Sequence, residues 1–377
     1  MLTRREYLQR ATLAGCGLAL MGTQAPQAEE GPDSKIDGHH SLKAHARKRG
    51  LLAGCAVGAA ELRDDTYRKI LAEQYDIVVA ENAMKFGSIQ PKPDTWFWDD
   101  ADALVAFAQE HKMKVRGHNF AWHENIPAWF AGTVTKDNAR KVLTDHILTE
   151  AGRYKGKIHS WDVVNEAINL DDGRPDGLRK CPWLDLIGPD YLELAYKTAR
   201  QADPNAKLTY NEYGIENDHE DNDKKRAATL DLIKRLKAAG APVDALGIQS
   251  HIAAAEWARY GKGLQDLIEA ARNMGLEVYV TELDVNDDDQ PNNDIAARDQ
   301  LIAQTYQKYL TTVLQNQAVK AVLTWGLTDK HTWLNDGKTH QKKQPNRRQR
   351  PLPFDDDYKP TPAYFAMRDC FDKAPHR

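Results

Sequence analysis

The chain has 377 residues, of which 41% are hydrophobic and 28% are charged, and its formal net charge at pH 7 is −4. This balance is typical of a globular protein and excludes a disordered or fibrous chain. The small negative charge gives no general attraction to nucleic acid or to an anionic membrane, so we expect no nucleic-acid partner and no stable membrane association.

The first feature in chain order is a targeting segment at the amino terminus. Arg4 and Arg5 precede the apolar run ATLAGCGLALMG, and a polar stretch that contains proline follows it. A charged start, a short apolar run and small residues after it are typical of an export signal. The sequence TRREYL also resembles a twin-arginine signal. We therefore expect an export signal over residues 1–28 and a periplasmic or secreted protein.

A lipoprotein form is the alternative at this end of the chain. The sequence LAGC, which ends at Cys16, is similar to a lipoprotein box. Arg10 leaves almost no apolar stretch before that cysteine, so we favour export without a lipid anchor. Cleavage is expected after Ala25 or after Ala28, and a polar tail is expected over residues 29–45.

Short apolar runs then alternate with longer runs that have helical spacing. Runs of this kind indicate strands that are buried on both faces and helices that cover them. Strands are expected at residues 51–58, 76–82, 113–119, 158–167, 207–213, 244–251, 277–285 and 320–327. Helices are expected at residues 64–75, 100–111, 137–154, 190–201, 224–240, 263–275 and 298–315. Asp64 and Asp137 precede helices in the manner of N-caps, and Gly240 and Gly275 lie where helices should end.

Alternating strands and helices pair in parallel, as a closed barrel or as an open doubly wound sheet. An open sheet gathers functional groups at one switch point, whereas a barrel brings the carboxyl ends of all strands to one mouth. Most of the expected strands end in chemically capable groups, namely Glu81 and Asn82, His118, Asn165 and Glu166, Asn211 and Glu212, Gln249 and His251, and Glu282 and Asp284. We therefore expect one α/β domain, a (β/α)8 TIM barrel over residues 46–377.

Two glutamates at strand ends point to a reaction. Glu166 follows WDVVN and Glu282 follows VYVT, so each ends an apolar strand. Burying a carboxylate there is costly unless the group is paired, hydrogen-bonded or used in chemistry. Cleavage of a glycosidic bond needs such a pair, one carboxyl protonated to assist the leaving oxygen and the other ionised. The residues alone do not say which glutamate has which role.

The ordered motifs RGHNFAWH, WDVVNEA, GIQSH, VYVTELDV and LTWGLTDKHTWL, with ENAMKF before them, resemble those of glycoside hydrolase family 10. The resemblance runs from about Leu51 to Phe371 and includes the closing stretch RPLPFDDDYKPTPAYFAM. That family consists mainly of endo-β-1,4-xylanases. The resemblance therefore implies an endo-1,4-β-xylanase that acts on xylan and xylo-oligosaccharides with retention of anomeric configuration.

The resemblance also implies a role for each matching position. Glu166 matches the acid/base and Glu282 the nucleophile, so their carboxyl groups are expected about 5–5.5 Å apart, as in retaining enzymes. Asn165 matches the residue that binds the sugar 2-hydroxyl, and His251 and Asp284 match residues that hold and ionise the nucleophile. The implied substrate-binding set is Glu81, Asn82, Lys85, His118, Trp122, Asn211, Gln249, Trp325 and Trp333.

Some positions depart from the family pattern or have no clear assignment in it. Asn119, Phe120 and Ala121 replace the common TLV and are expected to pack rather than bind. Glu212 stands where an aspartate is common, which leaves the local contacts open. His123 could support its loop rather than touch sugar, and Tyr213 is expected to face the cleft beside Asn211 as a supporting residue.

The segment GKTHQKKQPNRRQR over residues 337–350 is long and basic. A basic run of this kind is usually a solvated loop. The alternative hypothesis is that its charges favour uronic acid branches of the substrate. Neutralising Lys342, Lys343, Arg347 and Arg348 should then change the ratio of activity on acidic and neutral xylan.

Three rival functions remain beside the xylanase. A retaining β-1,4-glucanase would use the same chemistry on a different sugar. A metal-dependent hydrolase would need His118, His123 and His251 together, although the first strand lacks the usual HxH. A carbohydrate-binding barrel without activity would not need both glutamates. We expect a monomer without metal or organic cofactor. Cys55 is expected in the core, and the pairing of Cys181 with Cys370 stays open.

Overall fold

The computed structural model describes residues 34–337, 344 and 346–377. The expected export signal therefore lies outside the described residues. Residues Ile36–Arg377 form one compact unit. None of the helices in these described parts of the chain is both long enough and apolar enough to cross a membrane.

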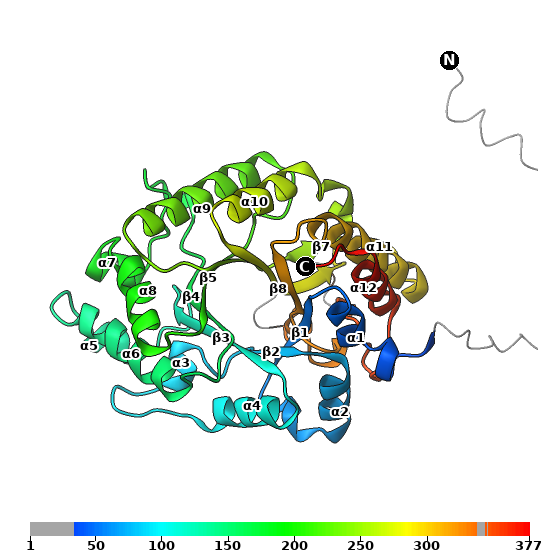
Figure 1. Cartoon of the computed structure of the whole chain (residues 1–377), viewed down its shortest axis with the longest axis horizontal. Coiled ribbons are helices and arrows are strands. Elements are labelled where there is room, and N and C mark those ends of the chain that lie inside the picture. Colours follow the sequence, from blue (N-terminus) through cyan, green and yellow to red (C-terminus); the bar gives the residue numbers. More distant parts are fainter. Residues whose placement is uncertain (1–33, 338–343, 345) are drawn as a thin grey trace, which may run out of the picture. The chain divides into compact units, whose positions relative to one another are not determined.

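Parallel strands close into a barrel, as Figure 1 shows. The strands are β1 (Leu52–Val57), β2 (Ile77–Ala80), β3 (Lys114–Ala121), β4 (Ser160–Asn165), β5 (Lys207–Glu212), β6 (Ala245–Ile248), β7 (His251–Ala253), β8 (Glu277–Asn286) and β9 (Val319–Thr324). Their order is β6-β5-β4-β3-β2-β1-β9-β8-β7, and an additional β6–β8 pairing closes the ring. Both β6 and β7 pair with β8, so together they form one of the eight barrel positions. The expected (β/α)8 barrel is confirmed.

Helices surround the barrel. They are α1 (Leu42–Arg47), α2 (Asp65–Gln74), α3 (Phe86–Ile89), α4 (Asp99–Glu110), α5 (Phe130–Thr133), α6 (Ala139–Arg153), α7 (Pro182–Ile187), α8 (Tyr191–Ala202), α9 (Glu220–Ala238), α10 (Lys262–Asn273), α11 (Ile295–Val313) and α12 (Pro362–Lys373). Each helix expected from the sequence overlaps one of these. The four short helices α1, α3, α5 and α7, and the longer α12, were not expected.

Local chemistry accounts for most of the helix boundaries that we expected. The Asp64 carboxylate accepts hydrogen bonds from the first-turn amides of α2, so it is an N-cap. Asp137 is not an N-cap, because α6 begins only after Asn138. Gly240 and Gly275 follow α9 and α10 with φ angles of 79° and 76°, the left-handed conformation that ends helices.

The strands are buried on both faces, which explains their continuous apolar character. On β2, Ile77 and Val79 belong to a cluster inside the barrel, which also contains Tyr279. Val78 and Ala80 alternate with them and pack in the larger cluster beneath the helices. This packing fixes the register of each strand and therefore the side chains that its carboxyl end presents.

The start of the compact unit precedes residue 46, where we expected the catalytic domain to begin. Leu42, His45 and Ala46 of α1 are buried, and α1 packs against α12. Part of the segment expected to be a polar tail thus belongs to the folded unit. Cys55 is in the core as expected, and Cys181 and Cys370 are both buried, unpaired thiols.

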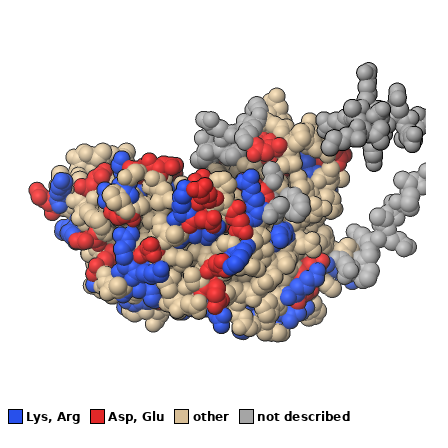
Figure 2. Space-filling view, turned by 90° about the horizontal axis from the view of Figure 1, so that it is seen from above, with Lys and Arg blue, Asp and Glu red and all other residues tan. Residues whose placement is uncertain are grey.

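Charged side chains of both signs are interspersed over the face of the molecule that Figure 2 shows. No large area of one sign stands out on this face. A mixed surface of this kind gives little long-range attraction for a polyanion.

Candidate active site

A cavity of about 490 Å³ opens among side chains of the strands and of the loops that follow them. It is lined by Glu81, Asn82, Lys85, His118, Trp122, His123, Glu124, Asn165, Glu166, Arg179, Tyr213, Gln249, His251, Glu282, Trp325, Trp333 and Asp336. The barrel thus brings both candidate catalytic glutamates and most of the expected binding set to one cavity. Asn211 and Asp284 are the site residues from our list that do not line it.

The two glutamates are linked by a chain of amide side chains. Asn211 Nδ2 donates to Glu282 Oε1 over 2.7 Å and to Asn165 Oδ1 over 2.9 Å. Asn165 Nδ2 donates to Glu166 Oε1 over 3.2 Å, and Gln249 Nε2 donates to the same oxygen over 2.9 Å. Because these amides come from adjacent strands, the ladder of the barrel fixes the position of each carboxylate relative to the other.

Asn211 is a support for the glutamates rather than a cleft residue. It is fully buried, and its Oδ1 accepts a hydrogen bond of 2.8 Å from Thr281. The neighbouring Gly247 makes room for it, because a Cβ there would lie 2.2 Å from Asn211 Oδ1. We expected the side-chain amide of Asn211 to bind substrate, but both of its polar atoms are hydrogen-bonded to other protein groups.

Glu282 is held in its ionised form. Burial would raise its pKa, but the hydrogen bond from His251, the charges of His118 and His251, and the hydrogen bond from Asn211 outweigh burial and lower the pKa to about 2. A carboxylate with two or three such partners is expected to ionise far below its ordinary range. At neutral pH this group can attack a carbon centre but cannot donate a proton.

His251 connects Glu282 to a buried aspartate. Its Nε2 lies 3.3 Å from Glu282 Oε2 and its Nδ1 lies 3.0 Å from Asp284 Oδ1, so both nitrogens face carboxylate acceptors. Burial would lower the pKa of His251, but Asp284 and Glu282 together raise it well above the ordinary value. Trp333 Nε1 donates to the other oxygen of Asp284 over 2.7 Å. The ring is therefore a fixed cation beside the candidate nucleophile.

Glu166 follows β4 in an unusual backbone conformation. Its φ angle is 58°, in the left-handed region, which costs a residue other than glycine about 1–3 kcal/mol. Its amide donates to the carbonyl of Asn211 over 2.9 Å. His123 Nδ1 lies 3.8 Å from Glu166 Oε2, beyond hydrogen-bond distance, so His123 approaches the cleft without holding the glutamate.

A second group of polar side chains lines the cavity from the loop after β2. Lys85 Nζ donates to Asn82 Oδ1 over 2.9 Å and lies 5.1 Å from the ring centre of Trp122. Burial lowers the pKa of Lys85, although Glu282 and Glu81 oppose this effect. Burial and the charge of Glu61 raise the pKa of Glu81 to about 7. These groups can donate to and accept from sugar hydroxyls beside the aromatic rings.

His118 and Trp325 line the same cavity and contact each other. His118 Nδ1 lies 2.8 Å from Asp162 Oδ2, and Arg116 pairs with the other oxygen of that aspartate. The rings of His118 and Trp325 meet edge to face at 5.5 Å. Trp325 and Trp333 both contact the ring of His251, with ring centres 6.1 and 5.2 Å away.

The sequence did not single out three residues that line the cavity, namely Glu124, Arg179 and Asp336. Each lies in a loop beyond a strand end, where no periodic pattern marks its direction. The contacts of Glu212, which we left open, are now defined. It is fully buried and accepts hydrogen bonds from Ile168 N, Tyr210 Oη and Tyr213 N. It therefore ties the loop after β4 to the end of β5.

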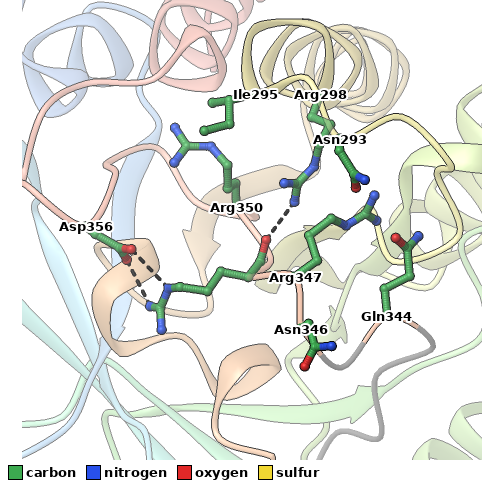
Figure 3. A pocket seen from close by; sticks show the side chains of 9 residues that line it. Asn293, Ile295, Arg298, Gln344, Asn346, Arg347, Arg350 and Asp356 are labelled. Atoms are coloured by element: carbon green, nitrogen blue, oxygen red, sulfur yellow. Dashed lines mark hydrogen bonds and ion pairs between the residues drawn. The ribbon is translucent and has the colours of Figure 1, made fainter.

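The basic segment borders a different cavity, of about 570 Å³, which Figure 3 shows. The arginines that line this cavity all have partners within the protein. Arg298 pairs with Asp287, Arg348 with Asp356 and Arg350 with Asp299, while Arg347 donates to the carbonyls of Asp287, Gln290 and Asn292. The described part of the segment thus holds the loops after β8 and β9 together. Lys342 and Lys343 lie outside the described residues.

The metal hypothesis required three histidines to meet. Instead, His118 faces Asp162 and His251 faces Glu282 and Asp284, while His123 lies beside Glu124. Within the described parts of the chain, no three His, Cys, Asp or Glu side chains are grouped so that they could hold a metal ion.

Known proteins resemble this chain over most of its length. The family model "Glycosyl hydrolase family 10" matches residues 41–370. Endo-1,4-beta-xylanase A of Thermoanaerobacterium saccharolyticum and Exoglucanase XynX of Acetivibrio thermocellus are each 36% identical over 84% of this chain. The chain spans only 26% and 28% of the lengths of these two relatives.

A solved structure gives the same result. The crystal structure of xylanase 10B from Thermotoga petrophila RKU-1 in complex with xylobiose is 33% identical and has a TM-score of 0.78. The match covers 88% of this chain and 97% of that one. The fold, the ordered motifs and the family model agree, and the chain belongs to glycosyl hydrolase family 10.

Proposed function

We propose that the protein is an endo-1,4-β-xylanase that hydrolyses the internal bonds of xylan with retention of configuration. The observation that carries the proposal is the pair of glutamates. Glu166 directly follows β4 and Glu282 lies within β8, yet both line one cavity and buried amides hold them in place. Family membership and the xylobiose in the related Thermotoga petrophila structure support a xylose-based substrate.

In the first step, Glu282 attacks the anomeric carbon while Glu166 donates its proton to the departing glycosidic oxygen. The C–O bond to the leaving sugar breaks, and a covalent glycosyl–enzyme ester forms. The low pKa of Glu282 supplies the ionised nucleophile. Asn165 lies between the two carboxylates, where it can bind the sugar 2-hydroxyl.

In the second step, Glu166 acts as a base. It takes a proton from water, the resulting hydroxide oxygen attacks the anomeric carbon, and the ester bond to Glu282 breaks. The second inversion at this carbon restores the original configuration. The cation at His251 remains beside Glu282 and favours its return to the ionised form.

The second candidate is a β-1,4-glucanase, which the name of the Acetivibrio thermocellus relative favours. Glucose carries a hydroxymethyl group that xylose lacks, and we infer that the large rings of Trp325 and Trp333, which line the cavity, leave no room for it. We expect reducing sugar from xylan and little from carboxymethylcellulose. The Glu282→Ala variant is the control for chemistry at this site, and NMR of the first-formed product reports its anomeric configuration. Greater release from carboxymethylcellulose would favour the glucanase.

We further propose that the protein is exported by the twin-arginine route without a lipid anchor. Arg4, Arg5 and the short apolar run after them support this proposal. Activity should appear in the periplasmic or extracellular fraction, and replacing both arginines with lysine should retain it in the cytoplasm. If the distribution of activity between the cell fractions does not change after this replacement, the protein does not use the twin-arginine route.

A further inference from the structure

The loop after β4 folds back so that its last part lies beside its first. Ile168 and Leu178 form an antiparallel bridge, and Arg179 N donates to Ala167 O over 2.7 Å. This hairpin returns Arg179 to Glu166, which lies 13 positions earlier. Arg179 is half-buried and lines the active-site cavity.

The guanidinium of Arg179 contacts the main chain of the candidate acid/base directly. Its Nε donates to Glu166 O over 2.7 Å, and its Nη2 donates to Tyr213 Oη over 2.9 Å. The amide of Glu166 donates to the carbonyl of Asn211 on β5, so both backbone polar groups of Glu166 are held, each by a different segment. A planar, always charged fork is suited to such a double contact, and a lysine would reproduce only part of it.

The backbone of Glu166 needs this support. Its φ angle of 58° is unfavourable for a residue with a side chain and persists only where the surroundings fix it. The direction of the Glu166 carboxyl depends on that backbone. A general acid must lie within hydrogen-bond reach of the oxygen that it protonates, so a small rotation would remove the assistance.

We propose that Arg179 is a positioning residue for the acid/base, which holds the backbone of Glu166 so that its carboxyl reaches the leaving oxygen. The inference rests on the proposed glycosidase function and deepens it. Arg179 acts through Glu166 rather than on the substrate. Its role is therefore greatest where the leaving group needs a proton.

An alternative role for Arg179 is to bind the sugar on the leaving-group side. The Tyr213 ring is exposed, and Arg179 Cζ and Lys225 Nζ lie 5.7 and 3.5 Å from its centre. This arrangement could hold a sugar face. The two roles differ in a measurable way, because a binding role needs a sugar in the leaving group, whereas a positioning role needs only a basic leaving oxygen.

The test compares phenyl and dinitrophenyl β-xylobiosides, which place no sugar on the leaving side. The value of kcat/KM reports glycosylation, in which phenoxide needs protonation and dinitrophenoxide does not. Arg179→Gln should lower kcat/KM about 10- to 100-fold on the phenyl substrate, part of the about 10²–10⁴-fold that general acids contribute. On the dinitrophenyl substrate the loss should stay below about threefold, and Arg179→Lys should fall between wild type and Arg179→Gln.

Arg174→Gln is the matched control, because Arg174 lies in the same hairpin but pairs with Asp176. Its kcat/KM on both substrates should stay near the wild-type values. Equal losses of Arg179→Gln on the two substrates, or no loss on either, would overturn the inference while leaving the proposed function intact. If Arg179→Gln does not fold, the comparison of Arg179→Lys with wild type decides by the same criterion. A wild type that is inactive on both substrates would refute the function and the inference together.

Discussion

The ionisation of Glu282 gives a prediction about the acid limb of the reaction. The ordinary pKa of a glutamate is 4.5, and that of Glu282 is about 2. This difference corresponds to about 3 kcal/mol in favour of the charged form, at about 1.4 kcal/mol for each pH unit. The hydrogen bond from His251 is the largest of the effects that lower the pKa. Replacing His251 with Asn removes that bond together with the positive charge of the ring.

The sign follows from the role of Glu282. A nucleophile must be ionised, so kcat/KM falls as the pH drops through its pKa, and a higher pKa moves the fall to higher pH. On dinitrophenyl β-xylobioside, which needs no acid assistance, wild type should keep its rate down to about pH 3. His251→Asn should begin to lose its rate about one to two pH units higher.

Asp284→Asn is the second variant in this test, because it leaves the ring in place but removes the carboxylate that raises the pKa of His251. Its acid limb should shift in the same direction by a smaller amount. Melting curves at each pH separate loss of activity from loss of folding. If the acid limbs of wild type and His251→Asn coincide, His251 does not set the ionisation of Glu282.

Further predictions concern individual side chains of the site. Glu282→Ala should abolish release of reducing sugar from xylan while its circular dichroism stays that of wild type. Glu166→Ala should still form the glycosyl–enzyme from dinitrophenyl β-xylobioside but hydrolyse it slowly, which stopped-flow absorbance would record as a burst followed by slow turnover. Because the pKa of Glu81 is about 7, KM for xylo-oligosaccharides should change between pH 6 and 8, and Glu81→Gln should remove this change. Gly247→Ala should destabilise the protein by about 1–3 kcal/mol in urea unfolding, because the new Cβ would collide with Asn211.

The sequence predicted the site residues that lie on or directly after the strands, because their position follows from the barrel topology alone. Most of the expected strands were apolar runs that ended in polar residues. A closed parallel barrel brings the carboxyl ends of its strands to one side, so it gathers these polar residues there. Glu166, Gln249 and Glu282 therefore reached the same cavity as expected. The rule says only that a strand end lies near the mouth, and Asn211 shows its limit, because its side chain turns beneath the cavity instead of into it.

Contacts that depend on loops could not be predicted in this way. Arg179 approaches Glu166 only because a hairpin closes between them, and no spacing in the sequence marks that return. The break between β6 and β7 could not be predicted from the sequence either. Ser250 adopts a φ angle of 69°, and β7 then begins with His251 facing Asp284. The apolar run within residues 244–251 predicts a strand but cannot locate the turn that directs His251 toward Asp284.

Two buried aspartates hold the histidines that act on the candidate nucleophile Glu282. Asp162 on β4 holds His118, and Asp284 on β8 holds His251. The charges of both rings lower the pKa of Glu282. Cationic partners favour a carboxylate that stays ionised, so the aspartates act on the reaction through the histidines: by holding charged rings beside Glu282 they keep the nucleophile ready for the first step.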